Sequence, residues 1–254
     1  MEPLPISAYI RTKNEERRIG EVVAAALQLC AEVIVVDSES TDRTREVAEK
    51  LGAKVILQPW LGNGHQKRVA EDAAQYDWLL DLDADEVVSD ALNQSVRELF
   101  KEEPKEGVYA IKVATVDPTG QLWEYGAADY RDKLYNKMQY RCPASKVWSN
   151  LEVPKGTVVK KLAGYLEHYS FPNIEFLLTK LNRVSTMRAQ EKKLKPLPLV
   201  IFRILFFFPI YLCRNLFRRG MWRYGVYAWS IAATTAASRW LTDVKMYEIH
   251  KGVK

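Results

Sequence analysis

The chain has 254 residues, of which 48% are hydrophobic and 27% are charged, with 12 Gly and 11 Pro. This composition is that of a globular protein and excludes collagen, long disordered chains and polytopic membrane proteins. The length is sufficient for one large domain, or one domain with an appendage, around a buried core. The net charge of +5 is compatible with several anionic partners, so its position along the chain must decide between them.

Three cysteines, Cys30, Cys142 and Cys213, are far apart in the sequence and form no CxxC pair. Their spacing argues against a disulfide framework or a structural zinc site and favours a reducing compartment. Residues 1–13 have no apolar segment of the kind found in secretory signals. We therefore expect a cytoplasmic protein.

Residues 6–36 predict a strand, a helix and a second strand. Residues 6–10 form a short apolar run, and residues 33–36 form a continuous β-branched run, which is typical of a strand buried on both faces. Between them, apolar side chains recur at the helical spacing i, i+3, i+4, i+7 and i+8: Ile19, Val22, Val23, Ala26 and Leu27.

Residues 42–100 continue this alternation. The helix expected at residues 42–51 can be capped by Ser40 or Thr41 and ends at Gly52. The elements expected after it are a strand at 53–57, a helix at 65–75, a strand at 78–82 and a helix at 89–100. Because strands and helices alternate at this spacing, we expect βαβ units and a mostly parallel sheet flanked by helices, an α/β fold.

A polar cluster follows each of the four expected strands, at residues 11–15, 37–42, 62–67 and 83–86. Ligands bind at the carboxyl ends of the strands in such sheets, so we expect all four clusters at one edge. The sequence contains neither GxxxxGK[ST] nor GxGxxG, so both standard phosphate-binding loops are absent. Phosphate charge would therefore need another counter-ion.

The acidic turn at residues 83–86 can hold such a counter-ion. Asp83 and Asp85 follow a buried strand at i and i+2, and their hard oxygen atoms suit Mg²⁺ or Mn²⁺. Such an ion would neutralise a diphosphate leaving group. The alternative is that these carboxylates are solvated or cap the next helix, but Asp81 at the end of the buried strand favours the metal site.

Together these motifs resemble those of the family-2 inverting glycosyltransferases of the GT-A fold, and more narrowly bacterial lipopolysaccharide core-assembly glycosyltransferases. The matching segments are residues 11–16 (RTKNEE), 35–42 (VVDSESTD), 62–67 (GNGHQK), 82–86 (LDADE), 166–171 (LEHYSF), 181–183 (LNR) and 185–186 (ST). The resemblance implies a GT-A-type, Rossmann-like catalytic domain in residues 1–172. Residues 173–254 would form a helical, membrane-associating extension.

The resemblance also implies roles for individual residues. Asp37 would contact the nucleotide base, Asp83 the ribose or the metal, and Lys67 the region of the diphosphate. Asp85 would be the chief metal ligand, and His168 would complete the metal site. The residues expected around the nucleotide sugar are Thr12, Asn14, Glu15, Asp37, Ser40, Gln66, Lys67 and Asp83. Taken singly, such residues are also common as turn, cap, solvated or core residues, and it is their combination that favours a site.

One motif of the resembled branch is altered. Its members commonly carry Val-His-Glu, whose Glu is the expected general base, and the corresponding residues here are Val147-Trp148-Ser149. A serine cannot replace the carboxylate that takes the proton from the acceptor hydroxyl. The remaining candidates for the catalytic base are Glu152, Asp129 and Glu124, and a catalytically degenerate protein is the alternative.

The C-terminal part of the sequence is basic and apolar. Residues 173–193 predict a helix, and residues 224–241 form an apolar run rich in Ala and aromatic residues. The apolar run at residues 199–213 is shorter than the about 20 residues of a spanning helix, so an interfacial or re-entrant helix fits better. Residues 180–223 contain 11 Lys or Arg and one acidic residue, a net charge of +10, so the rest of the chain carries −5.

Basic residues beside interfacial aromatic residues indicate an anionic membrane surface, and the alternative is a buried helix pair capped by solvated arginines. Nucleic acid is disfavoured as a partner because no nucleic-acid motif is present. We therefore predict a metal-dependent inverting hexosyltransferase that uses a nucleotide-sugar donor and a lipid-linked saccharide acceptor. It would be peripheral or monotopic on the cytoplasmic face of the bacterial inner membrane. The alternatives are transfer to a polyprenyl phosphate and a non-catalytic sugar-nucleotide-binding protein.

Overall fold

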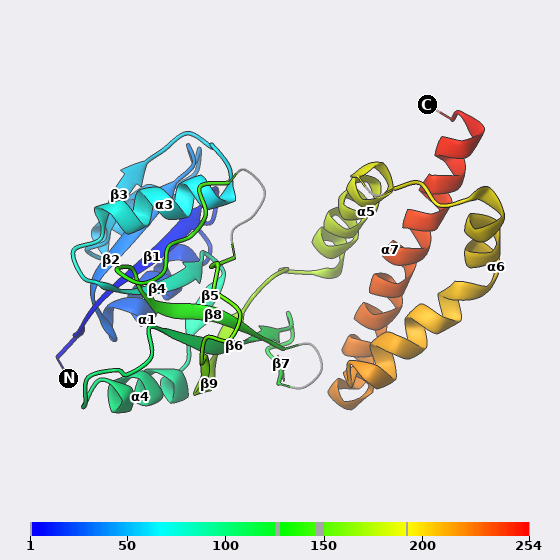
Figure 1. Cartoon of the computed structure of the whole chain (residues 1–254). Coiled ribbons are helices and arrows are strands. Elements are labelled where there is room, and N and C mark those ends of the chain that lie inside the picture. The colour runs from blue at the N-terminus through cyan, green and yellow to red at the C-terminus, as the bar shows by residue number, and fades with distance from the viewer. Residues whose placement is uncertain (1, 125–127, 146–149, 192, 254) are drawn as a thin grey trace. The chain divides into compact units, whose positions relative to one another are not determined.

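The computed structural model describes residues 2–124, 128–145, 150–191 and 193–253. The chain divides into two compact units (Figure 1). The first comprises Met1–Ala114 and Asp129–His168, and the second comprises Thr115–Ala128 and Tyr169–Lys254. The first unit therefore ends close to the boundary expected at residue 172, but residues 115–128 belong to the second unit, which no pattern in the sequence indicated.

The first unit is built on a sheet with the strand order β3-β2-β1-β4-β8-β6-β9-β5, and β7, which pairs with the end of β6, belongs to the second unit. Strands β1 to β4 are parallel, as expected, and the later strands pair antiparallel. The strands are β1 Leu4–Thr12, β2 Cys30–Asp37, β3 Lys54–Leu57, β4 Trp78–Asp83, β5 Glu86–Val88, β6 Val108–Val116, β7 Leu122–Trp123, β8 Asp129–Asn136 and β9 Lys160–His168. Its helices are α1 Ile19–Leu27, α2 Thr44–Lys50, α3 Asn63–Ala73 and α4 Asp90–Leu99.

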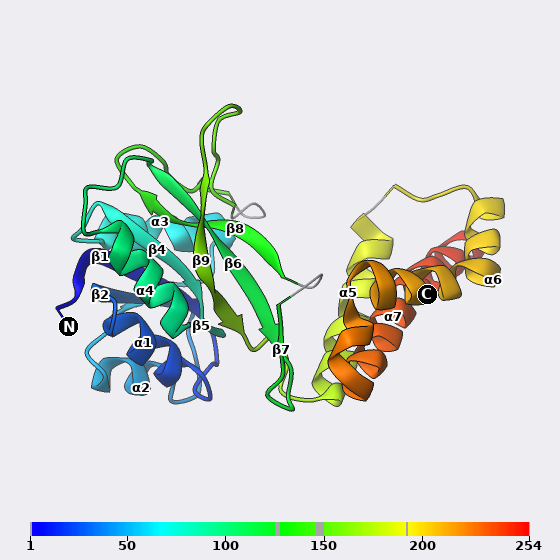
Figure 2. The same ribbon diagram turned by 90° about the horizontal axis from the view of Figure 1, so that it is seen from below.

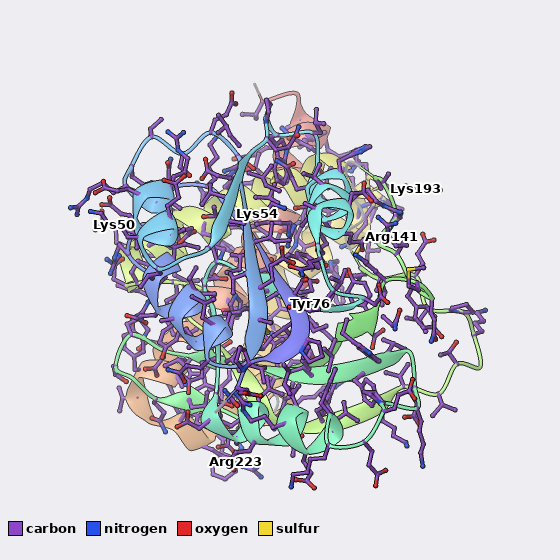
Figure 3. The ribbon with its side chains drawn as sticks, turned by 90° about the vertical axis from the view of Figure 1, so that its left-hand side faces the viewer. Lys50, Lys54, Tyr76, Arg141, Lys193 and Arg223 are labelled. Carbon is purple, nitrogen blue, oxygen red and sulfur yellow. The ribbon has the colours of Figure 1, made fainter. Side chains whose placement is uncertain are left out.

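The parallel strands are buried on both faces because successive side chains enter two separate apolar clusters. In β1, Ile6, Ala8 and Ile10 pack into one cluster, and Tyr9 packs into the other. Strands β2 and β4 alternate in the same way, which explains why their apolar runs are continuous. Figure 3 shows the layers, with Lys50 of α2 and Arg141 beside α3 on opposite sides of the strands.

Helix α3 is fixed on the sheet by a buried network around Glu71. The Tyr135 hydroxyl donates to Glu71 Oε1 at 2.7 Å and lies 2.9 Å from the Tyr9 hydroxyl. Arg141 Nε donates to Glu71 Oε2 at 2.6 Å. Because α3 carries two of the expected donor-site residues, this network also fixes part of the site.

Helix α2 begins two residues later than expected, and neither Ser40 nor Thr41 caps it, so that prediction was wrong. The Ser40 hydroxyl instead donates to Asp37 Oδ2 at 2.5 Å. The N–H of Thr44, the first residue of α2, donates to Asp42 Oδ1 at 3.0 Å. Asp42, rather than Ser40 or Thr41, therefore binds the start of the helix, while Ser40 binds Asp37.

The second unit contains α5 Ile174–Glu191, α6 Leu197–Cys213, the π-helical turn η1 Arg214–Arg218, the 3₁₀ turn η2 Met221–Tyr224 and α7 Gly225–Lys251. Helix α7 packs against both α5 and α6 (Figure 2). Trp123 of β7 stacks on Tyr224 with ring centroids 6.0 Å apart and lies in the same apolar cluster. Its indole N–H donates to Asp117 at 3.2 Å within the same hairpin, so packing of Trp123 on Tyr224 joins the hairpin to this unit and the hydrogen bond fixes the hairpin itself.

Helix α6 and η1 form a helical segment of 22 residues, Leu197–Arg218, which has a mean hydropathy of 1.8 and is long and apolar enough to cross a membrane. The expectation that this segment is too short is therefore wrong, because the π-helical turn extends it. Length alone does not distinguish a spanning helix from one that lies on a surface. An apolar row at helical spacing, here called the α6 stripe, is 40% to 66% exposed and consists of Ile201, Phe202, Leu205, Phe206, Ile210 and Phe217.

The contact between β9 and α4 gives a stability prediction. Gly164 has a φ of +82°, and a Cβ added there would lie 2.2 Å from the backbone nitrogen of Leu92. Gly164→Ala should lower the free energy of unfolding in urea by about 2–5 kcal/mol, from overpacking plus the strain of a positive φ.

The matched control is Gly156→Ala, because Gly156 has a φ of +93° but no atom within 4 Å of the added Cβ. It should lose only the backbone contribution of about 1–2 kcal/mol. Equal losses in the two variants would contradict the packing of β9 against α4.

Candidate functional site

Two adjacent cavities lie at the carboxyl ends of the parallel strands. The loop cavity, of about 490 Å³, is lined by Arg11, Thr12, Lys13, Glu15, Ser38, Trp60, Asp83, Ala84 and Asp85. The strand cavity, of about 370 Å³, is lined by Arg11, Lys67, Asp81, Asp83, Tyr130, Arg131, Asp132, Lys133, Asn150 and Leu151. Arg11 and Asp83 line both cavities. The prediction that the four polar clusters meet at one edge of the sheet is therefore confirmed.

The loops after β1 and β2 are fastened to each other by three of the expected donor-site residues. The Asn14 N–H donates to Ser40 Oγ at 2.8 Å, and Asn14 Oδ1 accepts the N–H of Thr41 at 2.8 Å. Asp37 is fully buried and accepts both the N–H and the hydroxyl of Ser40, at 2.8 and 2.5 Å. Asn14, Asp37 and Ser40 therefore hold the rim of the loop cavity together, and it is Ser38 that lines it.

Gln66, which was also expected to contact the nucleotide-sugar donor, is fully buried and binds the loops around the cavity. Its Nε2 donates to Ser38 Oγ at 2.8 Å and to the carbonyls of Gln58 and Pro59 at 3.1 and 3.3 Å. These bonds fix the segment that carries Trp60. The Trp60 side chain is 54% exposed and lines the loop cavity, where its ring offers an apolar face.

Lys67 and Asp81 form a buried ion pair on the wall of the strand cavity, with Lys67 Nζ 2.5 Å from Asp81 Oδ2. Burial would raise the pKa of Asp81, but the charges of Lys133 and Lys67 outweigh burial and lower it. Asp81 Oδ1 is buried and has no hydrogen-bond partner among the described residues. Asp81 is therefore a charged carboxylate with one acceptor position still open.

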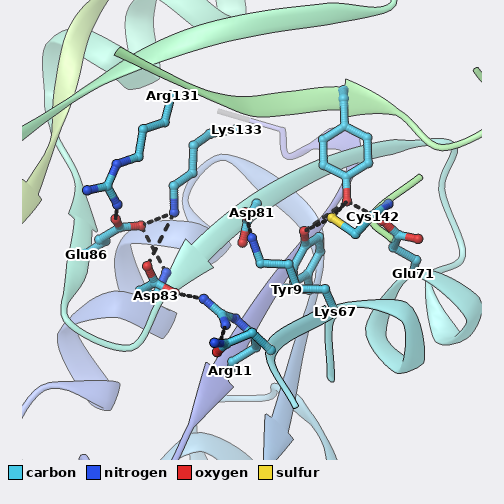
Figure 4. A network of polar contacts seen from close by, with 12 residues as sticks. Tyr9, Arg11, Lys67, Glu71, Asp81, Asp83, Glu86, Arg131, Lys133 and Cys142 are labelled. Atoms are coloured by element: carbon cyan, nitrogen blue, oxygen red, sulfur yellow. Dashed lines mark hydrogen bonds and ion pairs between the residues drawn. The ribbon is translucent and has the colours of Figure 1, made fainter. Parts of the chain in front are cut away.

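Beside this pair lies a second set of charged residues, here called the charge group: Arg11, Asp83, Glu86 and Lys133 (Figure 4). Arg11 bonds Asp83 through its guanidinium group. Lys133 Nζ lies 2.6 Å from Glu86 Oε2 and 3.7 Å from Asp83 Oδ2. Asp83, expected at the ribose or the metal, is thus held between two cations that come from β1 and β8.

The pKa values in this group follow from burial and from the neighbouring charges. Burial would raise the pKa of Asp83, but Lys133 and Arg11 hold it below its usual range. Burial would lower the pKa of Lys133, but Asp81, Glu86 and Asp83 raise it. For Glu86, burial raises the pKa more than Lys133 lowers it. Asp83 and Lys133 are therefore both charged at neutral pH.

The structure brings together two of the three expected metal ligands. Asp85 Oδ2 lies 3.3 Å from His168 Nε2, because the register of β5 and β9 sets His168 opposite Glu86, the next residue after Asp85. The Asp83 carboxylate is bonded to Arg11 instead. In the part of the chain that the structure describes, no three His, Cys, Asp or Glu side chains form a group that could hold a metal ion. Asp85 and His168 form an open pair that could hold one with ligands supplied by a substrate.

Of the described residues that line the strand cavity, none is one of the expected general bases. Glu124 belongs to the second unit. Asp129 is exposed at the start of β8, and Glu152 is exposed although its neighbour Leu151 lines the cavity. Ser149, at the altered motif, lies outside the described residues.

Asp132, which lines the strand cavity, was not among the residues expected from the sequence. Pairing between β6 and β8 passes from Tyr109–Leu134 to Ala110–Asp132, so Lys133 is an extra residue in β8. Such a bulge turns consecutive side chains toward one side, which accounts for Asp132 and Lys133 facing the same cavity.

Burial raises the pKa of Asp132, and its side chain has no hydrogen-bond or ion-pair partner among the described residues. The polar run at residues 129–133 could have indicated Asp132, but nothing in the sequence indicated the bulge that turns it toward the cavity. Trp60 was missed as well, because a single Trp in a loop has no distinctive spacing.

Residues 7–157 match the family described as Glycosyl transferase family 2, which is more than half of the chain. The chain belongs to this family. An uncharacterized glycosyltransferase of Rickettsia conorii is 36% identical over 85% of this chain and 82% of the relative. The lipopolysaccharide core biosynthesis glycosyltransferase LpsC of Rhizobium meliloti is 29% identical over 97% of this chain and 93% of LpsC. The crystal structure of S. aureus TarS 1–349 is 14% identical, with a TM-score of 0.43 over 99% of this chain and 92% of that chain.

Membership of this family confirms the resemblance drawn from the motifs and the GT-A type of the α/β sheet. The family-2 glycosyltransferase carries its C-terminal helices, one of them strongly apolar, as a separate compact unit. The two cavities lie in the first unit, and most of the family match falls in that unit.

The charge group predicts a specific loss of stability. The Lys133 side chain is 4% exposed and faces two carboxylates, Asp83 and Glu86. Breaking a buried ion pair by removing one partner costs about 3–5 kcal/mol, so Lys133→Met should lower the free energy of unfolding in urea by about that amount.

The double variant Lys133→Met/Glu86→Gln removes one carboxylate together with its cation and should recover part of the loss. If the double variant were as unstable as the single variant, or less stable, the ion pair would not be the source of the effect.

Proposed function

We propose that the protein is a metal-dependent inverting hexosyltransferase that transfers a sugar from a nucleotide-sugar donor to a hydroxyl of a lipid-linked saccharide. The observation that carries this proposal is that two cavities meet at Arg11 and Asp83, at the carboxyl ends of the parallel strands. One cavity suits the nucleotide and the other suits the reacting sugars. The name of the relative LpsC, which refers to lipopolysaccharide core biosynthesis, supports this class of acceptor.

The nucleoside would bind in the loop cavity. The ring of Trp60 offers a stacking surface for a base, an interaction of about 1–3 kcal/mol. Thr12 and Ser38 line the same cavity and offer polar groups to the base or the ribose. Asp37 and Ser40 support this arrangement from beneath by fixing the loop.

The diphosphate would lie beside Asp85 and His168, which fit a divalent cation because one carboxylate plus substrate phosphates is a common ligand set for Mg²⁺. Bound there, Mg²⁺ or Mn²⁺ would neutralise the charge that develops on the departing diphosphate. Arg11 and Lys67 line the adjoining strand cavity and would favour the same negative charge.

Asp132 is the general base that this geometry supports best. Its pKa is raised by burial, and its carboxylate lines the strand cavity without a partner among the described residues. It would take the proton from the acceptor hydroxyl as that oxygen bonds to the anomeric carbon. The bond from the anomeric carbon to the diphosphate breaks on the opposite side, which inverts the configuration.

The second unit would bring the enzyme to its acceptor at the cytoplasmic face of the membrane. The α6 stripe is apolar and exposed, and Arg218, Trp222 and Arg223 follow it in the chain and are exposed as well. An exposed apolar row next to cationic and aromatic residues supports a helix that lies in the interface of an anionic membrane.

The metal assignment is tested by Asp85→Ala. With Mn²⁺ and a panel of nucleotide-sugar donors, release of the nucleoside diphosphate should fall by about 100-fold or more, because the leaving group loses its cation. Asp90→Ala is the control, since Asp90 is exposed, follows in the same segment and lines neither cavity. Full activity of Asp85→Ala would contradict the assignment.

The base assignment is tested by Asp132→Asn. Donor binding measured by calorimetry should be unchanged, whereas transfer should fall by about 10²–10⁴-fold. Because burial raises the pKa of Asp132, the wild-type rate should fall on acidification at a higher pH than for an ordinary aspartate. That acid limb should be missing from the residual activity of the variant.

Asp129→Asn is the matched control on the same strand, because Asp129 is exposed and lines neither cavity. If Glu152→Gln or Glu124→Gln lost transfer while Asp132→Asn stayed active, the general base would be Glu152 or Glu124 and not Asp132.

A further inference from the structure

A third cavity, here called the apolar groove, lies between α6 and α7 of the second unit. It has a volume of about 380 Å³, within the range of about 300–1,000 Å³ that small-molecule sites occupy. None of the described side chains that line it is charged, and the function proposed above makes no use of it. The lining consists of Ile201, Ile204, Leu205, Trp240, Val244 and Tyr247.

The wall of the apolar groove is fixed by packing and by a hydrogen bond. Ile204 and Tyr247 pack against a cluster that contains Val200 and Met246, both of which are fully buried. The Trp240 indole N–H donates to the backbone carbonyl of Ile204 at 2.9 Å, which holds the indole ring against α6. The groove therefore lies beside a closed core and is not a gap between loosely packed helices.

Polar contacts that are not part of the groove join the same two helices. Asp243 of α7 accepts from Arg203 Nε at 2.8 Å and from the Tyr211 hydroxyl at 2.9 Å, and both donors belong to α6. At the end of α7, His250 Nε2 lies 2.8 Å from the carbonyl oxygen of Lys195, just before α6. Because these contacts already hold α6 on α7, joining the helices does not by itself account for the apolar lining of the groove.

Water is a poor occupant of the apolar groove, and a hydrocarbon is a good one. A water molecule needs about two to four polar partners to remain in a cavity, and apolar cavities take up apolar molecules instead. The indole N–H of Trp240 is already bonded to the carbonyl of Ile204. A hydrocarbon chain gains free energy with each methylene group that it buries against such a wall.

The apolar groove is continuous with the α6 stripe. Ile201 and Leu205 belong to both, and they are 40% and 66% exposed. They lie on the helical segment Leu197–Arg218, which is long and apolar enough to cross a membrane. The groove is therefore open on the surface that we propose to contact lipid, so a lipid chain is the occupant that its position favours.

A cation lies at one end of the apolar groove. Trp240, Val244, Tyr247 and Lys251 are spaced at i, i+4, i+7 and i+11 on α7 and so share one face of the helix. Lys251 Nζ lies 5.6 Å from the ring centroid of Tyr247. Lys251 is exposed, and no ion pair joins it to an acidic side chain in the described part of the chain. An apolar groove that ends at an exposed cation complements a molecule with a hydrocarbon chain and an anionic head group.

We propose that the apolar groove binds one hydrocarbon chain of an anionic membrane lipid, whose head group lies beside Lys251. The choice of a membrane lipid rests on the membrane association proposed above, whereas the groove and its cation do not. Such a site retains a single lipid molecule, which distinguishes it from the diffuse attraction of basic residues to an anionic surface.

The test is native mass spectrometry of the full chain released from a nonionic detergent. The protein is first incubated with an equimolar mixture of phosphatidylglycerol and phosphatidylcholine that carry the same acyl chains. The wild-type protein should retain one lipid molecule and should prefer phosphatidylglycerol. Retention of no lipid, or retention without a preference between the two lipids, would overturn the proposal.

The role of the groove is tested by Val244→Phe, whose larger side chain occupies part of it. Retained lipid should fall by about tenfold or more, because excluding about two methylene groups from an apolar site lowers affinity by about that factor. Val226→Phe is the matched control, since it is the same substitution on the same helix at a side chain that is 84% exposed and lies outside the groove. Equal retention by the two variants would overturn the proposal.

The position of the head group is tested by Lys251→Gln. The preference for phosphatidylglycerol should fall by about fivefold, the effect of one basic residue near an anionic head group. Lys193→Gln makes the same change of charge at an exposed lysine of this unit that does not line the groove, and it should keep the preference. Both lysines are exposed, so this comparison remains valid if Val244→Phe fails to fold. An equal preference in the two variants would overturn the proposal.

The same spectra detect a second copy of the chain, which would also cover an apolar groove. A dimer that is lost in Val244→Phe and kept in Val226→Phe would overturn the assignment to a lipid. Binding to vesicles separates this inference from the proposed function. If the wild-type protein retained phosphatidylglycerol but did not bind vesicles that contain it, the groove would be supported and the proposed membrane association would be contradicted.

Discussion

The need to compensate buried carboxylates at the end of β4 determines the arrangement of the candidate site. A carboxylate in this position is stable only when cations and hydrogen-bond donors surround it. The cations come from three elements far apart in the sequence, so β1, α3 and β8 must all be correctly placed around β4. The carboxylates are Asp81, Asp83 and Glu86, and the cations are Arg11, Lys67 and Lys133. The walls of both cavities therefore form together with the charge group.

The two units of the chain differ in how far their charged side chains are paired. In the first, acidic and basic side chains pair closely, and Asp132 lines the strand cavity without a partner among the described residues. In the second, basic side chains outnumber acidic ones, and one helical segment carries an exposed apolar stripe. This division gives a physical meaning to the uneven charge of the sequence, in which residues 180–223 carry +10. The two ligands that we propose, a nucleotide-sugar donor and an anionic membrane surface, would require such different environments.

Local patterns predicted much of the fold and of the site. The strands β1 to β4, the helices between them and the meeting of their polar ends follow from apolar periodicity and from a general rule of parallel sheets. The features that escaped prediction depend on contacts between distant segments. The bulge at Lys133 that turns Asp132 into the cavity arises from the pairing of β8 with β6, and Trp123 joins the second unit through its contact with Tyr224. Ser40 was expected to cap a helix because a serine just before a helix is a usual cap. Its hydroxyl instead donates to Asp37, which the local sequence did not distinguish from a cap.

We propose that a nucleoside diphosphate and a divalent cation bind together where the two cavities meet. The most direct measurement is a crystal structure of the full chain grown with Mn²⁺ and a nucleoside diphosphate, with the metal located by its anomalous scattering. We expect one strong peak bonded to Asp85 and His168 and to the diphosphate, with the base over Trp60 in the loop cavity. A peak elsewhere in the first unit, or a nucleotide bound outside both cavities, would contradict it.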